Sequence, residues 1–152
     1  MNHGELAQKN FEGGCNCAQA VLLAFSDLTG LDEQTAMKLS ASFGGGMGKL
    51  REVCGAVSGM FMAAGMILAD GEIPTQEAKA AHYARIRDLA ARFKEENGSY
   101  LCRELLDGIP TSSDPAPEER SPKYYKQRPC GELCRCAAEL LDQFLKEQKE
   151  SA

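Results

Sequence analysis

Residues 53–69 read VCGAVSGMFMAAGMILA, a run of 17 residues without a formal charge. A membrane-spanning helix needs about 20 predominantly apolar residues, whereas this run is shorter and is interrupted by a serine and three glycines. We therefore expect a buried central helix over about residues 52–69 rather than a membrane span. Gly55, Gly59 and Ala63 lie four positions apart on one face of this helix, so a neighbouring helix can approach closely there.

The sequence on either side of this run is rich in helix-forming residues and shows no convincing alternation of apolar and polar residues. Asn16, Asp32 and Thr75 have side chains that cap helix N-termini, and Gly98 marks a helix end. The helices that we expect lie at about residues 5–11, from Asn16, from Asp32, at 75–97, at 99–106 and at 130–149. The predicted fold is all-α, a compact bundle of about five to six helices around the buried Gly/Ala/Met-rich central helix, in one domain over residues 1–152.

Composition and charge exclude several classes of protein. The chain has 152 residues, 43% of them hydrophobic, with 17 Lys and Arg against 22 Asp and Glu and a formal net charge of -5. This length and apolar content suit one folded domain and exclude a disordered chain. The acidic balance argues against a nucleic-acid-binding protein, which needs a basic face, and against docking on anionic lipid. The first residues lack the basic start and apolar stretch of a signal peptide, so we expect a cytoplasmic protein.

Two segments without helical periodicity are candidates for contact with a functional site. Residues 108–129 contain five of the six prolines, and a loop of this length in a compact protein commonly covers a site. Residues 44–49, GGGMGK, match a phosphate-binding loop only in part, because Phe43 and Leu50 occupy positions that need glycine and a hydroxyl. We expect instead a flexible hinge whose backbone passes close to the site and whose amides can hydrogen-bond to sulfur atoms there.

Seven cysteines are the main chemical feature of the chain, and an odd number cannot pair fully within one chain. Those at the cap or in the first turn of an expected helix are Cys17, Cys54, Cys102 and Cys130. At such a position the helix dipole lowers the pKa of a thiol, and four converging thiolates suit a [2Fe–2S] or [4Fe–4S] cluster, or tetrahedral zinc. Their separations of 37, 48 and 28 positions are unlike the C-x-x-C turns of zinc fingers and ferredoxins. Because buried cysteine also serves as a small hydrophobic residue, a shared metal site and a structural role both remain open.

Several motifs occur in a fixed order around these cysteines. They are FEGGCNCAQAV at residues 11–21, FGGGMG at 43–48, CGAVSG at 54–59, Cys102, and Arg128-Pro129-Cys130. Together these motifs resemble the C-GCAxxG-C-C family of redox-active proteins, and a similar domain occurs in split-Soret cytochromes. The resemblance covers about residues 11–138. It implies a helical, redox-active protein whose four characteristic cysteines act together as ligands of an iron–sulfur cluster, here Cys17, Cys54, Cys102 and Cys130.

Cys15, Cys134 and Cys136 depart from the family pattern and leave the ligand set open. Cys134 lies four residues after Cys130 on the same helix face, so it can replace Cys130 as a ligand or form a disulfide with it. Leu141 continues the apolar stripe of Cys134, which favours a role in the core. Cys136 points elsewhere, as a surface thiol.

The preferred hypothesis is a cytoplasmic all-α protein that binds an iron–sulfur cluster, of the [2Fe–2S] type, through the four cysteines of the family pattern. It would act in electron transfer or redox sensing with a redox partner protein, as an electron carrier or as an oxidoreductase. One alternative is a metal-free thiol–disulfide protein, in which Cys130 pairs with Cys134 or Cys17 pairs with Cys54. Another is a structural zinc site in a helical domain. A homodimer could form across the Gly-rich central helix.

Overall fold

The computed structural model describes residues 1–151 of the chain. Within these residues the fold is all-α, as predicted, and the sole β-type contact is an isolated antiparallel bridge between Val53 and Leu101. The helices are α1 (His3–Glu12), α2 (Cys17–Ala24), α3 (Ser26–Thr29), α4 (Glu33–Ser40), α5 (Gly55–Leu68), α6 (Gln76–Asn97), α7 (Cys102–Leu105), α8 (Pro122–Gln127) and α9 (Cys130–Ser151). A 3₁₀ turn, η1 (Ala41–Phe43), extends α4.

Several helix boundaries follow the predicted capping residues. The side chains of Asn16, Asp32 and Thr75 each accept a hydrogen bond from the backbone amide three residues further on, at the N-termini of α2, α4 and α6. Gly98 ends α6 in the left-handed conformation, with φ of 87°. The predicted start of each of these three helices and the predicted end of α6 are therefore confirmed.

Other boundaries differ from the prediction, and the described chain contains more helices than the predicted bundle of about five to six. The helix expected from Asn16 stops at Ala24, and α3 follows as a separate turn. The prediction that residues 108–129 form a loop throughout is wrong, because α8 lies within them. Pro122 is the first residue of α8, where its restricted φ suits a helix, and Ser121 caps it. Proline therefore begins a helix here rather than interrupting one.

Helix α5 is central to the core, and it begins at Gly55 rather than near residue 52 because Cys54 is its N-cap. The glycines on its first turns allow α2 to pack closely against it. A Cβ added at Gly59 would lie 2.6 Å from the carbonyl oxygen of Ala18, and one at Gly55 would lie 3.0 Å from Cβ of Cys17. The predicted close approach of a neighbouring helix is confirmed, and it places Cys17 beside the N-terminus of α5.

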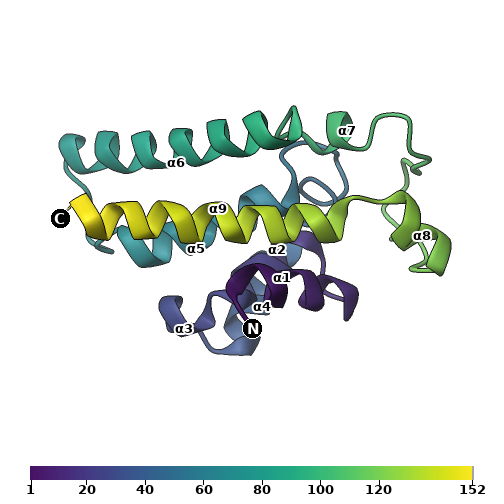
Figure 1. Cartoon of the computed structure of the whole chain (residues 1–152), viewed down its shortest axis with the longest axis horizontal. Helices are drawn as coiled ribbons and strands as arrows, with labels where there is room; N and C mark the ends of the chain where they lie inside the picture. Colours follow the sequence, from purple (N-terminus) through teal and green to yellow (C-terminus); the bar gives the residue numbers. More distant parts are fainter. Residues whose placement is uncertain (152) are drawn as a thin grey trace.

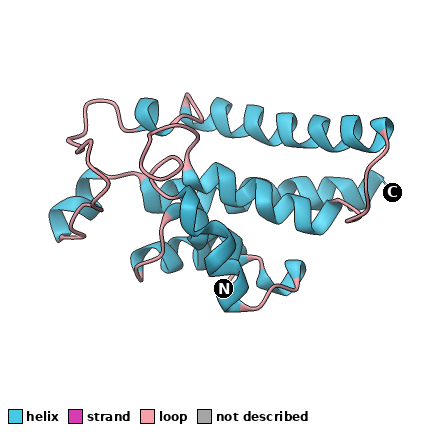
Figure 2. Ribbon diagram, turned by 180° about the vertical axis from the view of Figure 1, so that it is seen from behind, coloured by secondary structure: helices cyan, strands magenta, loops and turns pink. Residues whose placement is uncertain are grey.

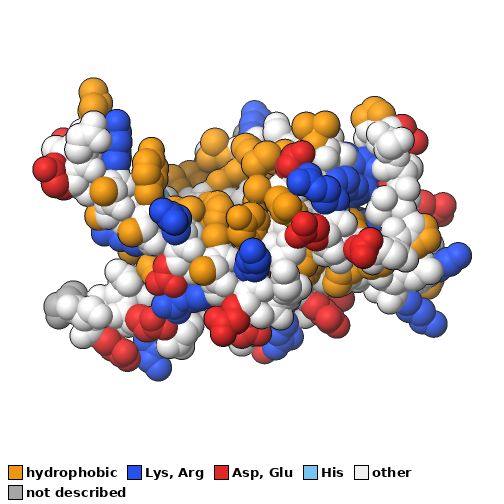
Figure 3. All heavy atoms as spheres, turned by 90° about the horizontal axis from the view of Figure 1, so that it is seen from above, with side chains coloured by type: hydrophobic (Ala, Val, Ile, Leu, Met, Phe, Trp, Pro, Cys, Tyr) orange, Lys and Arg blue, Asp and Glu red, His pale blue; other side chains and the backbone are white. Residues whose placement is uncertain are grey.

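Helices α5, α6 and α9 run side by side along the length of the molecule, and α1 to α4 pack at one side of them (Figures 1 and 2). The buried residues of α9 are Cys130, Leu133, Cys134, Ala137, Ala138, Leu141 and Phe144. Of the 22 residues of α6, only Leu89 and Phe93 are buried, and hydrophobic side chains gather on the face that carries α6 (Figure 3). Among residues 1–151, no helix combines the length and the apolar character needed to cross a bilayer.

His3 joins the N-terminal helix to α3 and α9, a contact that the sequence did not indicate. Its Nδ1 lies 2.7 Å from Asp142 Oδ1, and its Nε2 lies 2.9 Å from Asp27 Oδ1. The imidazole ring stacks on Phe25 with 4.2 Å between ring centroids. Burial lowers the pKa of His3, but the hydrogen bonds with Asp27 and Asp142 outweigh burial and raise the pKa above its usual 6.5.

We expect His3 to make the stability of the fold depend on pH. Because its pKa is raised in the folded protein, His3 contributes stability that is fully present below the usual value of 6.5 and is lost as the pH rises through the folded pKa. Urea unfolding of the wild type and of His3→Gln, at pH values from below 6.5 to above it, measures the effect. The difference in free energy of unfolding between the two proteins should shrink as the pH rises. His82→Gln is the matched control, and a difference for His3→Gln that stays constant with pH would contradict the prediction.

Candidate functional site

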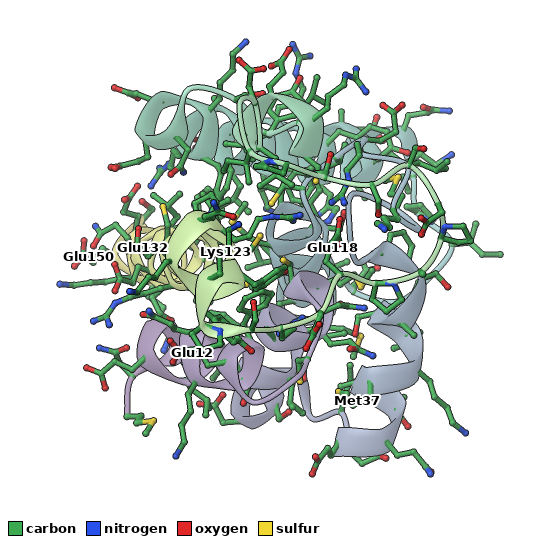
Figure 4. The ribbon with its side chains drawn as sticks, turned by 90° about the vertical axis from the view of Figure 1, so that its right-hand side faces the viewer. Glu12, Met37, Glu118, Lys123, Glu132 and Glu150 are labelled. Carbon is green, nitrogen blue, oxygen red and sulfur yellow. The ribbon has the colours of Figure 1, made fainter. Side chains whose placement is uncertain are left out.

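A cavity of about 440 Å³ lies at the end of the bundle where several helices begin. Its lining comes from the N-terminal ends of α2, α5, α7 and α9, from the Gly-rich loop of residues 44–51, and from the Pro-rich segment 110–129. Figure 4 views the molecule from this end, and Glu118 lies near the middle with sulfur atoms on either side of it in this view. Glu150 lies at the left edge of the same view, and Met37 lies in its lower part. Both segments that the sequence placed near a functional site therefore reach this cavity.

Four cysteines from four separate elements line the cavity. Cys17 is the first residue of α2, Cys102 the first of α7 and Cys130 the first of α9. Cys54 is the N-cap residue of α5. The fold thus brings to one cavity four positions of which each is 28 to 48 residues from the next in the sequence.

The pKa values of these thiols are raised, contrary to the prediction from the helix dipole. Burial raises the pKa of Cys54 to about 12, even though the nearby backbone amides of Ala56 and Val57 act in the opposite direction. Burial also raises the pKa of Cys102, although a hydrogen bond from Arg51 acts in the opposite direction. A helix N-terminus does favour the thiolate, but exclusion from water has the larger effect. As free thiols, Cys54 and Cys102 are therefore protonated at neutral pH.

Two other thiols, those of Cys130 and Cys134, act on the pKa of Cys17. Its hydrogen bond with Cys130 lowers the pKa of Cys17, but the hydrogen bond with Cys134 and burial together raise that pKa well above its usual value. The pKa of Cys130 is raised by the hydrogen bond with Cys17 and then by burial. Cys134 is fully buried, and its Sγ donates to the carbonyl oxygen of Cys17 at 3.7 Å. Cys134 therefore touches the four-cysteine set from the side of the core.

The cavity also carries positive charge, a feature that the sequence did not indicate. The cations that line it are Lys49, Arg51, Arg120 and Arg128. Arg51 Nη1 lies 3.6 Å from Cys102 Sγ, and the positive charge of Arg128 acts on Cys130 to oppose the rise in the pKa of its thiol. Arg51 Nε is buried and has no hydrogen-bond partner among residues 1–151. In the sequence, the one indication that these arginines lie near the thiols is their position. Arg51 lies three residues before Cys54, and Arg128 lies two residues before Cys130.

The Gly-rich loop has a left-handed backbone and lies against Cys102. The φ angle is positive at six residues of 45–51, and a Cβ added at Gly46 would lie 2.7 Å from Cβ of Cys102. The expected proximity of this loop to the site is confirmed. Its amides are able to bond to sulfur atoms, and those of residues 47–52 donate to carbonyl oxygens of residues 42–47. These hydrogen bonds hold the loop in its own turn instead.

A protein-family model described as "Putative redox-active protein (C_GCAxxG_C_C)" matches residues 15–144. The chain belongs to this family. The matched residues include all seven cysteines and the whole Gly-rich loop, so the resemblance inferred from the motifs is confirmed. No curated protein and no solved structure showed a significant match to the chain.

In this member of the C_GCAxxG_C_C family, Cys15 and Cys136 stand apart from the other five cysteines. Cys15 Sγ lies 3.9 Å from Met37 Sδ, and Cys136 Sγ accepts a hydrogen bond from Asn97 Nδ2 at 3.5 Å. Both cysteines are half-buried, so the expected surface position of Cys136 holds only in part. The cysteines of the candidate site are therefore the four that line the cavity, together with Cys134 behind them.

The C_GCAxxG_C_C description indicates a redox-active protein without naming the group that carries electrons. In the part of the chain that the structure describes, no three side chains of histidine, cysteine, aspartate or glutamate form a group suited to a metal ion. What the geometry does offer is a set of buried thiols next to cationic side chains.

Proposed function

We propose that this protein binds an iron–sulfur cluster of the [2Fe–2S] type and acts in electron transfer or redox sensing. The residues that would hold the cluster are Cys17, Cys54, Cys102 and Cys130. The observation that carries the proposal is their placement: four cysteines from four elements of a redox-active family member line one cavity. Thiolate sulfur is the usual protein ligand of iron–sulfur clusters.

The other residues of the cavity fit such a cluster in charge. A cluster held by four thiolates is an anion, and the three arginines and Lys49 that line the cavity exceed the charge of Glu118 there. The N-termini of α2, α5 and α9 add partial positive charge at the same end of the bundle. Arg51 Nε, buried without a partner among the described residues, is a donor that an additional acceptor in the cavity would satisfy.

When bound, an iron–sulfur cluster supplies a redox couple whose potential depends on net charge, hydrogen bonds to sulfur and solvent exposure. The residues of this chain act on each of these quantities. Arg51 and Arg128 hold positive charge beside Cys102 and Cys130, and Arg51 also donates a hydrogen bond to sulfur. The apolar residues that line the cavity and limit access of water are Phe11, Leu105, Leu106 and Leu133.

A metal-free thiol–disulfide protein is the second candidate, and the contacts of Cys17 favour it. The thiols of Cys130 and Cys134 both act on the pKa of Cys17, so either one is a candidate partner of Cys17 in a disulfide. This pairing differs from the predicted pairs of Cys130 with Cys134 and of Cys17 with Cys54. A structural zinc site fits a redox-active family less well, because zinc has no redox chemistry.

Metal analysis with a visible absorption spectrum, on protein purified without oxygen, tests the proposal. We expect iron and acid-labile sulfide at about two each per chain, together with charge-transfer bands. Zinc at about one per chain in a colourless protein would overturn the cluster and support a structural zinc site. Absence of metal from protein handled in this way would overturn it in favour of the thiol–disulfide candidate. Mass spectrometry of the oxidised protein would then have to show one dominant disulfide.

A further inference from the structure

Glu118 lies at the meeting point of several hydrogen-bond donors beside the cavity. Its Oε1 accepts hydrogen bonds from Arg51 Nη2 at 2.9 Å and from the backbone amide of Ser112 at 3.3 Å. Arg128 Nη2 lies 3.2 Å and Lys49 Nζ lies 3.7 Å from the same oxygen. One carboxylate oxygen therefore stands where three cationic side chains converge from separate parts of the chain.

These cations are withdrawn from water, which makes an anion at this point necessary. The side chains of Lys49, Arg51 and Arg128 are 9%, 16% and 5% exposed. A buried charge is costly unless an opposite charge or hydrogen bonds compensate it. Asp114 adds a second carboxylate 3.7 Å from Lys49 Nζ, but its side chain is 63% exposed. Glu118 is thus the main counter-charge of the three cations.

Two of these cations, Lys49 and Arg51, lie on the Gly-rich loop, where the backbone is left-handed. Lys49 and Arg51 have φ of 65° and 60°, a conformation that costs about 1–2 kcal/mol per residue for side chains with a Cβ. Such conformations persist where the surrounding structure holds them, and they concentrate at functional sites. The loop therefore holds Lys49 and Arg51 in place at some cost to its own stability.

Arg51 connects this group of cations to the thiols. Its Nη1 is 3.6 Å from Cys102 Sγ, and its Nη2 is 2.9 Å from Glu118 Oε1. An anion in the place of the Glu118 carboxylate would consequently bind the same guanidinium group, that of Arg51, that contacts the sulfur of Cys102. Glu118 lies in residues 110–121 of the Pro-rich segment, which we call the strap. Side-chain hydrogen bonds connect the strap to the wall of the cavity, and the strap belongs to neither a sheet nor a long helix.

We propose that Lys49, Arg51 and Arg128 form a binding site for a small oxyanion or carboxylate, and that Glu118 occupies this site from within the chain. An external anion binds when the strap moves the Glu118 carboxylate aside. Charge and the convergence of donors set the chemical class of the ligand, since guanidinium and ammonium groups both favour carboxylates and oxyanions. The site goes beyond the proposed function, because it does not depend on which group the cysteines hold.

Thermal unfolding with sulfate and acetate as probes tests the site, with sodium chloride used to keep ionic strength constant. A ligand that binds only the folded state raises the midpoint of unfolding of the protein, and the rise follows the logarithm of ligand concentration once that concentration exceeds the dissociation constant. Removal of the internal competitor in Glu118→Ala should lower the apparent dissociation constant for at least one probe by about tenfold or more, since a tethered carboxylate competes at an effective concentration in the millimolar range. Glu119→Ala, an exposed neighbour, is the matched control and should respond like the wild type.

Two results would overturn the anion site. One is an equal response of Glu118→Ala and Glu119→Ala to both probes. The other is a gain in Glu118→Ala that persists after Lys49→Met is added, because the ligand would then bind elsewhere. If Glu118→Ala does not fold, Glu118→Gln removes the charge with little change in shape, and the same gain is required of it. Iron content measured on the same samples separates this outcome from failure of the proposed function, because the response to sulfate or acetate does not require iron.

Discussion

Cys54→Ser is expected to lower the iron content of the anaerobically purified protein by at least about tenfold, because serine oxygen is a poor substitute for thiolate sulfur around iron. Cys54 is the N-cap of α5 and is buried in the wall of the cavity. Its replacement would therefore remove one ligand of the proposed set. Iron and acid-labile sulfide per chain, measured together with the visible spectrum, provide the readout.

The matched control for this variant is Cys136→Ser. Cys136 is half-buried and contacts Asn97 rather than the cavity. The iron content of Cys136→Ser should therefore equal that of the wild type. The same measurement on Cys134→Ser tests whether the fifth thiol is a ligand or part of the core. Unchanged iron in Cys54→Ser would exclude the proposed ligand set.

Gly59→Ala is expected to reduce the free energy of unfolding by about 2–3 kcal/mol, which is the usual effect of overpacking a tight interface. The added Cβ would lie 2.6 Å from the carbonyl oxygen of Ala18 and 3.0 Å from Cβ of Val21. Because the nearest atom belongs to the backbone of α2, the two helices would have to separate. Urea unfolding followed by circular dichroism measures the change.

Gly65→Ala provides the control within the same helix. Its added Cβ would have His82 Nε2 as its nearest neighbour, at 4.0 Å, so only the gain in helix propensity remains. That gain is up to about 1 kcal/mol in favour of the folded state. The two substitutions should therefore change stability in opposite directions. Equal stability of Gly59→Ala and the wild type would show that α2 and α5 do not pack in the way described.

Features that depend on a few neighbouring residues could be predicted from the sequence. Asn16, Asp32 and Thr75 cap helices because each side chain accepts a hydrogen bond from an amide three residues away, an interaction within one turn. The apolar run of residues 53–69 indicated the central helix, again from neighbouring residues alone. Gly59 indicated a tight contact of that helix with a neighbouring helix, which is α2. The helix α8 lies in a segment that its five prolines indicated as a loop, although proline suits the first helical position, which Pro122 occupies here.

The direction of the thiol pKa shifts could not be predicted in this way. The position of Cys54 at a helix start is a local property and favours the thiolate. Its burial depends on what the rest of the chain places around it, and burial raises the pKa of Cys54 to about 12. The local effect was therefore correct in sign but smaller than the effect of the tertiary environment.

The helical fold, the family and the four cysteines at helix starts could all be inferred from the sequence, because periodicity, caps and ordered motifs are carried by residues close together in the chain. That these cysteines line one cavity, and that Arg51, Arg128 and Glu118 meet beside them, follows from the three-dimensional packing of the chain. Arg51 and Glu118 are 67 positions apart, and nothing in either neighbourhood specifies the other. Contacts of this kind arise from the packing of whole helices and the course of the loops between them, which no short segment encodes.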